Sequence, residues 1–110
     1  TLLGYAMYET AATPEAPVTE RLGDVPAGHL SKLYVLAEGR GTGLAEALVH
    51  DGVERLRRLG FRHVWLGTNA QNTRANRFYE RLGFATIGAR QFVVGGERVE
   101  DDWVRLLTVE

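Results

Sequence analysis

The sequence predicts an α/β protein whose mixed sheet is flanked by helices. Short apolar, β-prone runs alternate with two stretches of helical apolar spacing, in the order strand, strand, helix, strand, helix, strand, strand. The chain has 110 residues, 45% of them hydrophobic and 25% charged, which is the usual mixture of a folded globular protein. Because this length is below that of one average domain, we expect residues 1–110 to form a single domain.

The first predicted strand begins almost at residue 1. An apolar run over 2–8 has no cap or turn before it, so we expect this chain to be part of a longer protein. Residues 9–28 follow, with Pro14, Pro17 and Pro26 among small and polar residues. Proline removes backbone donors, so this segment is predicted to be a long irregular loop that is either functional or mobile.

The central part of the chain predicts a strand, a glycine-rich turn and a helix. Residues 29–36 are mostly apolar, and glycines are frequent over 38–43. From residue 44 to 59 an apolar residue or glycine recurs every fourth position, which predicts an amphipathic helix. Arginines in its last turns suit the negative end of a helix, and Gly60 is the expected left-handed terminator.

The remaining third predicts a strand, a helix and a hairpin. A short apolar strand over 63–68 precedes a helix that Asn72 or Thr73 would cap and Gly83 would end. Residues 84–109 then read as two strands around a glycine pair, which permits the positive φ values of a tight hairpin turn.

Composition excludes several classes of function. The net charge is −1, which provides no positive field for nucleic acid or an anionic membrane, so neither is expected as a partner. There is no cysteine, hence no disulfide, thiolate zinc site or cysteine nucleophile, and the three histidines lack metal-ligand spacing. We expect no metal and, since no apolar run approaches about 20 residues, a cytoplasmic protein.

The glycine-rich loop is the first candidate site. Arg40-Gly41-Thr42-Gly43-Leu44-Ala45 lies between a strand and a helix, where free amides and the helix dipole favour a pyrophosphate. An ordinary tight turn is the alternative. A P-loop is excluded because no Lys-Ser or Lys-Thr pair occurs, and Glu46 at the third glycine position weakens a dinucleotide site and with it a nucleotide-dependent oxidoreductase.

Two motifs together resemble the GNAT N-acetyltransferase superfamily. The loop at 40–45 is similar to its Arg/Gln-x-x-Gly-x-Gly/Ala acyl-CoA motif, and Leu33-Tyr34-Val35 precedes it at the family's spacing. The segment Asn72-Thr73-Arg74-Ala75-Asn76-Arg77-Phe78-Tyr79-Glu80-Arg81-Leu82-Gly83-Phe84 resembles its Asn-x-x-Ala-x-x-Phe-Tyr-Glu-x-x-Gly-Phe segment. The resemblance covers residues 1–108 and implies a mixed, mostly antiparallel sheet. It begins at the family's third strand, so the first strand, the two substrate-side helices and the second strand have no counterpart.

The resemblance implies a role for each matching residue. The backbone of Leu33, Tyr34 and Val35 would pair with the pantetheine arm of acetyl-CoA, the amides of residues 41–45 would hold its pyrophosphate, and Arg40 opens that loop. Asn72 would bind the pantetheine arm, and Tyr79 would be the general acid toward the departing thiolate. Read without the resemblance, Tyr79 is a packing residue on an apolar helix stripe and Asn72 is a helix cap.

The acceptor and the general base are less defined. In the branch that acetylates protein N-termini a Glu stands five residues before the Asn, and here that place is Gly67. Trp65-Leu66-Gly67, Phe92 and the Gly95-Gly96 turn instead resemble bacterial spermine/spermidine-type acetyltransferases. A polyamine would need carboxylates, for which Glu97, Glu100, Asp101 and Asp102 form the nearest cluster and Glu9 is the alternative, unless the cluster is only a solvated hairpin. His29 is a candidate proton relay or an ordinary surface histidine.

The function implied by the resemblance is acetyl transfer from acetyl-CoA to a primary amine of a small molecule, such as a polyamine. The amine would attack the thioester directly, with an oxyanion donor near Val35. The alternative is a CoA-binding or assembly fragment without turnover, in which an exposed sheet face and edge would favour pairing with a second copy of the chain as a homodimer.

Overall fold

The computed structural model describes residues 3–10, 14–94, 96 and 98–109. Within these residues, five strands and three α-helices follow one another, with a short 3-10 turn at Ala37–Gly39. In order, they are β1 (Gly4–Glu9), α1 (Ala16–Leu22), β2 (Gly28–Val35), α2 (Leu44–Arg58), β3 (His63–Asn69), α3 (Thr73–Arg81), β4 (Ala85–Val94) and β5 (Arg98–Thr108).

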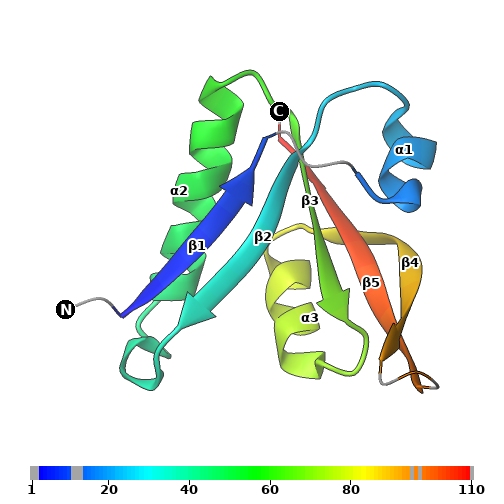
Figure 1. Cartoon of the computed structure of the whole chain (residues 1–110). Helices are drawn as coiled ribbons and strands as arrows, with labels where there is room; N and C mark the ends of the chain where they lie inside the picture. The colour runs from blue at the N-terminus through cyan, green and yellow to red at the C-terminus, as the bar shows by residue number, and fades with distance from the viewer. Residues whose placement is uncertain (1–2, 11–13, 95, 97, 110) are drawn as a thin grey trace.

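The strands form one sheet in the order β1-β2-β3-β5-β4 (Figure 1). Only β2 and β3 run parallel, and the other neighbours are antiparallel. The predicted class, α/β with a mixed and mostly antiparallel sheet flanked by helices, is therefore confirmed. Within the part of the chain that the structure describes, no helix is long and apolar enough to cross a membrane.

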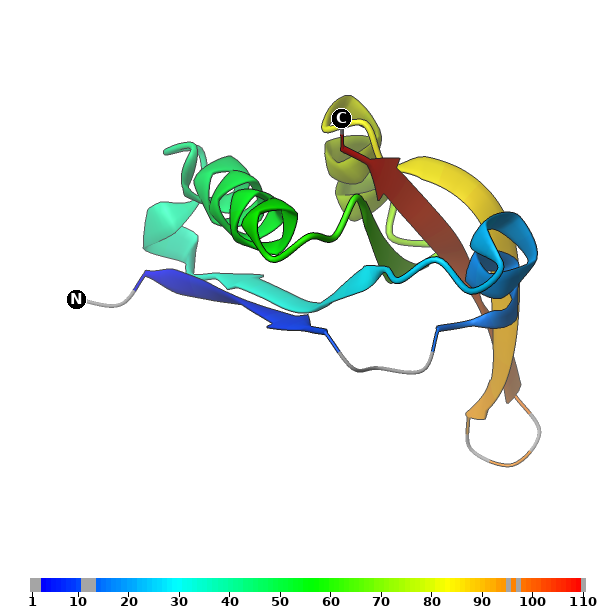
Figure 2. The ribbon, with the colours of Figure 1, turned by 90° about the horizontal axis from the view of Figure 1, so that it is seen from above.

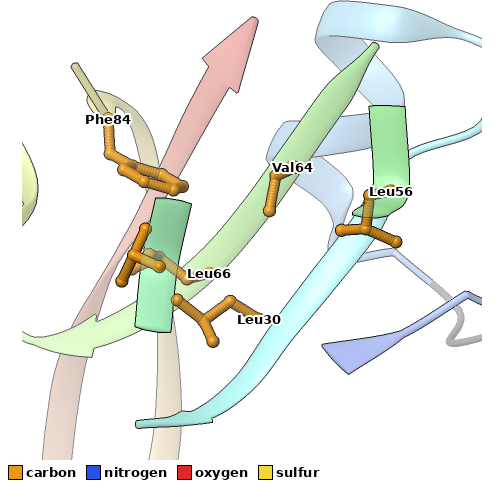
Figure 3. Close-up of a cluster of buried hydrophobic side chains, with 6 residues drawn as sticks. Leu30, Leu56, Val64, Leu66 and Phe84 are labelled. Carbon is orange, nitrogen blue, oxygen red and sulfur yellow. The ribbon is translucent and has the colours of Figure 1, made fainter. Parts of the chain in front are cut away.

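Each face of the sheet carries its own hydrophobic core. Figure 2 shows α2 and α3 on one side of the sheet, with α1 apart from them next to β4. The core under α2 and α3, part of which is drawn in Figure 3, contains Leu30, Val49, Leu56, Val64, Leu66 and Phe84. The core under α1 contains Val18, Ala27, Trp65, Val104 and Leu106. Residues 64, 65 and 66 alternate between the two cores because successive strand side chains point to opposite faces.

Residues 16–22 correct the prediction of an irregular loop over 9–28, because they form helix α1. Pro17 lies in the first turn of that helix, where a missing amide hydrogen costs nothing. Pro14 and Pro26 fall outside the helix, and Val18 anchors it in the second core. The prolines therefore delimit a helix, and the tertiary contact of Val18 stabilises a segment too short to be helical alone.

A buried arginine fixes α3 against the sheet. Arg105 of β5 donates from Nε to Asn76 Oδ1 at 3.1 Å and from Nη1 to the carbonyl of Phe84 at 2.7 Å. The Asn76 side-chain amide in turn donates to the carbonyls of Asn69 and Asn72. These bonds satisfy a desolvated charge and tie both ends of α3 to neighbouring strands. The helix that carries Tyr79 is thus rigidly placed.

Helix α2 packs on β1 through a glycine. A Cβ at position 52 would fall on the ring of Tyr8, whose hydroxyl donates to the carbonyls of Leu48 and Val49 at 3.3 and 3.1 Å. At an exposed helix position Gly→Ala stabilises by about 1 kcal/mol. At Gly52 the overlap reverses this sign, and we expect Gly52→Ala to lower the free energy of unfolding by about 1–3 kcal/mol in urea denaturation.

Two further variants test this explanation. The double variant Gly52→Ala/Tyr8→Ala has no ring at position 8, so the overlap is absent. Its loss in free energy of unfolding is expected to be smaller than the sum of the losses in the two single variants. His50→Ala, at an exposed position of the same helix, is the control and is expected to stay within about 0.5 kcal/mol of the parent. Additive losses in the double variant would show that the ring is not the cause.

Candidate active site

The sheet opens where β2 and β3 part. These parallel strands are paired only at Gly28 with Val64 and at His29 with Trp65. Beyond that pair they separate, as Figure 1 shows, and α3 lies behind the opening. Two cavities flank the separated strands, one under the N-terminus of α2 and one along the strands themselves. The edge of β2 that faces this opening is therefore available for an extended ligand.

The first cavity has a volume of about 590 Å³. Its lining comes from the end of β2, the turn before α2, and one side of α3. The residues are Leu33, Val35, Gly39, Arg40, Gly41, Gly43, Leu44, Ala45, Glu46, Asn72, Arg74, Ala75, Phe78, Tyr79 and Arg81. This size suits a drug-sized ligand.

The N-terminus of α2 opens onto this cavity. Gly43 is the N-cap residue and has a φ of +84°, a left-handed conformation that other residues adopt at a cost. Among the described residues, the amides of Gly41, Gly43 and Ala45 donate no backbone or side-chain hydrogen bond, whereas Leu44 N approaches the Thr42 hydroxyl at 3.4 Å. Free amides at the positive end of a 15-residue helix favour an anionic group.

Basic side chains surround the same cavity. Arg40, Arg74 and Arg81 line it together with one carboxylate, Glu46. The arginines outnumber the acid three to one, so the lining favours a ligand with several negative charges. The sequence motifs identified Arg40 alone. Arg74 and Arg81 are each two residues from a predicted site residue, Asn72 and Tyr79, and only the packing of α3 beside the turn before α2 shows that they share this cavity.

The second cavity, of about 430 Å³, lies along the separated strands. It is lined by Tyr5, Leu30, Ser31, Lys32, Leu33, Tyr34, Leu66, Gly67, Thr68, Asn69, Asn72, Ala75 and Tyr79. Leu33, Asn72, Ala75 and Tyr79 line both cavities. These four residues are thus where an anionic ligand seated at α2 and a second molecule approaching along the strands would meet.

Tyr79 is placed at this junction by aromatic packing. Its ring makes edge contacts with Phe78 and Phe84, with centroids 5.3 and 5.8 Å apart. Burial raises the pKa of its phenol above the usual 10.0, so the hydroxyl stays protonated at neutral pH. Within the residues that the structure describes, the hydroxyl makes no hydrogen bond. Tyr79 can therefore have both predicted roles, because its ring packs in the core while its hydroxyl remains available to a ligand.

Asn72 likewise combines a structural contact with a place on the cavity wall. Its Oδ1 accepts the amide of Ala75 at 3.1 Å, which confirms the predicted helix cap. The same residue lines both cavities, so a cap and a ligand contact can coexist. On the wall of the second cavity, the hydroxyl of Thr68 is buried and has no hydrogen-bond partner in the described part of the chain. An unpartnered buried hydroxyl on a cavity wall is a group that a ligand can satisfy.

The predicted site residues are brought together with two qualifications. Nine of them line the first cavity: Leu33, Val35, Arg40, Gly41, Gly43, Leu44, Ala45, Asn72 and Tyr79. Tyr34 lines the second cavity instead, and Thr42 lines neither. The hydroxyl of Thr42, an exposed residue, donates to the carbonyl of Gly39 within the turn. The roles assigned to these residues stay predictions.

The predicted carboxylate cluster is divided. Asp102 is buried and accepts hydrogen bonds from Nε and Nη2 of Arg90 at 3.2 and 3.0 Å, while Glu15 accepts from Nη1 at 2.6 Å. The charge of Asp102 is thus paired with that of Arg90, so this carboxylate is not free to bind a polycation. Glu97, and the side chain of Glu100, lie outside the described residues. Where side chains are described, no group of three or more metal-binding residues occurs.

The sheet separates beside a glycine-capped helix, and a phenol lies at the junction of two cavities, so the fold defines a ligand-binding domain. The sequence model of the acetyltransferase (GNAT) family matches residues 1–84. The chain belongs to this family.

Individual relatives agree with this assignment. An uncharacterised N-acetyltransferase of Mycobacterium tuberculosis (strain ATCC 25618 / H37Rv) is 44% identical over 82 residues, covering 74% of this chain and 52% of that protein. The mycothiol acetyltransferase of Parafrankia sp. (strain EAN1pec) is 38% identical over 91 residues, covering 76% of this chain and 28% of that protein. The chain thus spans about half the length of the first relative, and less of the second.

The fold recurs in solved structures. The crystal structure of the NatC complex bound to Gag peptide and CoA matches 98% of this chain and 62% of the other, with a TM-score of 0.76 and 21% sequence identity. At this identity the likeness concerns the fold alone.

Proposed function

We propose that this chain transfers the acetyl group of acetyl-CoA directly to the primary amine of a small molecule. GNAT acetyltransferases use acetyl-CoA as the acyl donor, and this chain is a member of that family. One observation carries the proposal: a single cavity is lined both by the residues with free amides, Gly41, Gly43 and Ala45, and by Tyr79. The amides and arginines bind the diphosphate, and the free edge of β2 binds the pantetheine arm.

Tyr79 and a backbone amide provide the chemistry at the thioester. The amine attacks the carbonyl carbon, and the amide near Val35 stabilises the negative charge that forms on the oxygen. The nitrogen loses one proton to solvent, and when the C–S bond breaks Tyr79 donates its proton to the sulfur and recovers one from water. No acyl-enzyme is proposed, since the chain has no cysteine and its one serine, Ser31, donates its hydroxyl to the carbonyl of Met7 and not to a base.

The acceptor is proposed to be a small amine, with polyamines as one class to test. Glu9, at the end of β1, is the remaining predicted carboxylate for a cationic acceptor, because Asp102 is paired with Arg90. A relative named mycothiol acetyltransferase supports a small molecule as acceptor in this part of the family.

Acetyl-CoA binding is the first testable consequence. At a concentration a hundredfold above its dissociation constant, acetyl-CoA is expected to raise the free energy of unfolding by about 2.7 kcal/mol, and NADH is expected to have no effect. Differential scanning fluorimetry measures both. Stabilisation by NADH and not by acetyl-CoA would contradict the donor assignment.

Turnover is tested by release of free thiol in the presence of acetyl-CoA and an amine. The amines to be tested are spermidine, glucosamine, cysteamine and a short peptide with a free N-terminus. For cysteamine, the acetylated product is detected by its mass. Acetylation of a small amine is the expected result. Acetyl-CoA binding without transfer to any of them would support the second candidate, a non-catalytic CoA-binding or assembly unit.

That second candidate is favoured by one observation. Tyr5, Met7 and Tyr34 are 40%, 47% and 48% exposed on β1 and β2, and Tyr5 lies against Tyr34 with ring centroids 5.8 Å apart. An apolar strand face of this kind is available to another polypeptide. Sedimentation of the CoA-bound protein, alongside the thiol assay, distinguishes an assembling unit from a monomeric enzyme.

A further inference from the structure

The second cavity reaches both faces of the sheet. Leu66 and Tyr79 line it from the side of α2 and α3, where both contact the core under those helices. Tyr5 and Tyr34 line it from the opposite side, because they are cross-strand partners and Leu33, the neighbour of Tyr34, packs against that same core. The first cavity lies on the helix side. A second molecule that does not compete with a ligand there therefore enters from the face of Tyr5 and Tyr34.

Lys32 is the one charged residue in the described lining of this cavity. It is exposed and pairs across the strands with the exposed Met7, so its side chain lies on the same face as Tyr34, two residues further on. The next residue, Leu33, lines both cavities. Within the residues that the structure describes, no carboxylate forms an ion pair with Lys32. A basic side chain without an acidic partner there thus lies at the entrance, one residue from the junction of the cavities.

Two carboxylates near this face of the sheet are paired with another cation. Glu15 and Asp102 accept hydrogen bonds from Arg90, with N–O distances of 2.6 and 3.0 Å. The guanidinium of Arg90 covers Gly67, where an added Cβ would overlap it. Gly67 lines the second cavity, whereas Glu15 and Asp102 line neither cavity. These two acids are therefore not available to a cation that enters beside Lys32.

Glu9, the acid predicted as the alternative for a polyamine, also lies outside both cavities. Its Oε1 is 3.9 Å from Nδ1 of His29, whose ring stacks on Trp65 with centroids 3.8 Å apart. On the described lining of the second cavity a polycation thus finds no carboxylate and meets the charge of Lys32. Because like charges across an interface repel, this cavity favours an acceptor that carries a negative charge.

A buried hydroxyl on the wall of the same cavity indicates that a ligand binds there. Thr68 is 6% exposed and lines the second cavity, and its Oγ1 has no hydrogen-bond partner in the described part of the chain. Native proteins rarely leave such a group unsatisfied. Its side chain shares a face with that of Leu66, two residues earlier on β3, so a ligand that satisfies it lies between the separated strands.

We propose that the acceptor amine carries an anionic group at its other end, a carboxylate in the simplest case, and that Lys32 binds this group. This inference rests on the proposed function. Nζ of Lys32 donates charge-assisted hydrogen bonds to the carboxylate, which orients the free amine toward the thioester. Because Lys32 and Leu33 are adjacent, with Cα atoms about 3.8 Å apart, a chain of only a few carbon atoms separates the amine from the carboxylate. Lys32 selects and orients the acceptor and takes no part in the proton transfers.

Three linear amines of matched length test the class of acceptor: 4-aminobutanoate, 4-aminobutan-1-ol and 1,4-diaminobutane, with acetyl transfer measured as thiol release. We expect kcat/KM to be about tenfold higher for 4-aminobutanoate than for the alcohol, and lowest for the diamine. Equal values for the three amines, or the highest value for the diamine, would overturn the proposal and leave the acetyltransferase activity established. If the wild-type protein acetylates no amine, the proposed function fails and this inference fails with it.

Substitutions at position 32 test the role of the lysine. Lys32→Gln is expected to remove the preference for 4-aminobutanoate while leaving kcat/KM for the alcohol and acetyl-CoA affinity within about twofold. Lys32→Glu should reverse the order in favour of the diamine, and Lys32→Arg should keep the wild-type order. Arg21→Gln is the matched control and should also keep that order, because Arg21 is exposed on α1 and lines neither cavity. The wild-type order in Lys32→Gln would show that Lys32 does not bind the acceptor.

Lys32 is the one lysine in the sequence, which allows a second measurement that needs no turnover. Reductive methylation with carbon-13 gives its side chain a single NMR signal and keeps its charge. In the CoA-bound protein, 4-aminobutanoate is expected to shift this signal, and 1,4-diaminobutane at the same concentration is expected to leave it in place. No shift with 4-aminobutanoate, or an equal shift with the diamine, would contradict the proposal.

Discussion

Replacing Tyr79 by phenylalanine is expected to lower kcat by about 10²-fold or more and to leave acetyl-CoA affinity unchanged. The ring keeps its edge contacts with Phe78 and Phe84, so only the proton donor is lost. Because burial raises the pKa of Tyr79 above 10.0, the wild-type phenol stays mainly protonated up to pH 9. We therefore expect the rate loss to be the same from pH 7 to 9, measured as thiol release under saturating acetyl-CoA.

Tyr8→Phe is the matched control for this prediction. Tyr8 also has a half-buried phenol, but its hydroxyl donates to carbonyls of α2, and the residue lines neither cavity. Its removal is expected to lower the melting temperature and to leave kcat of the folded protein unaltered. If Tyr79→Phe retained the wild-type kcat, the acid role would be wrong and Tyr79 would be a packing residue.

The second large effect is expected at Gly43. Valine there would weaken acetyl-CoA binding by about 100-fold, since its side chain would extend into open space beside the free amides of the loop. Titration calorimetry with acetyl-CoA measures this change. The substitution also costs about 1–2 kcal/mol of stability because the residue has a φ of +84°.

Gly60→Val separates the binding effect from the backbone strain. Gly60 follows the other end of α2, has a φ of +100°, and likewise has nothing within 4 Å of an added Cβ. It is expected to lose similar stability and to bind acetyl-CoA like wild type, because it lies outside both cavities. Equal losses of affinity in the two variants would indicate a general effect of strain and would contradict the pyrophosphate site.

Local sequence chemistry accounts for the elements that the sequence predicted well. Three such signals depend only on neighbouring residues in the chain. They are the four-residue apolar spacing of α2, the Asn72 cap, and the glycines after α2 and α3. Helix α1 was missed because its signal, Pro17 in a first turn, looks identical to a helix breaker until Val18 has a core to enter. Such a short helix depends on contacts that no local pattern reveals.

The sequence by itself determined the class of the sheet, the glycine loop before α2, and the family to which both motifs point. These features depend on spacing along the chain, which is readable without a fold. Only the tertiary structure decided that Arg74 and Arg81 share a cavity with Arg40, that Arg90 covers Gly67 and engages Asp102, and that His29 meets Trp65 and Glu9. The partners in these contacts are far apart in the chain. Their side chains come within interaction distance only when the strands pair and the helices pack on the sheet.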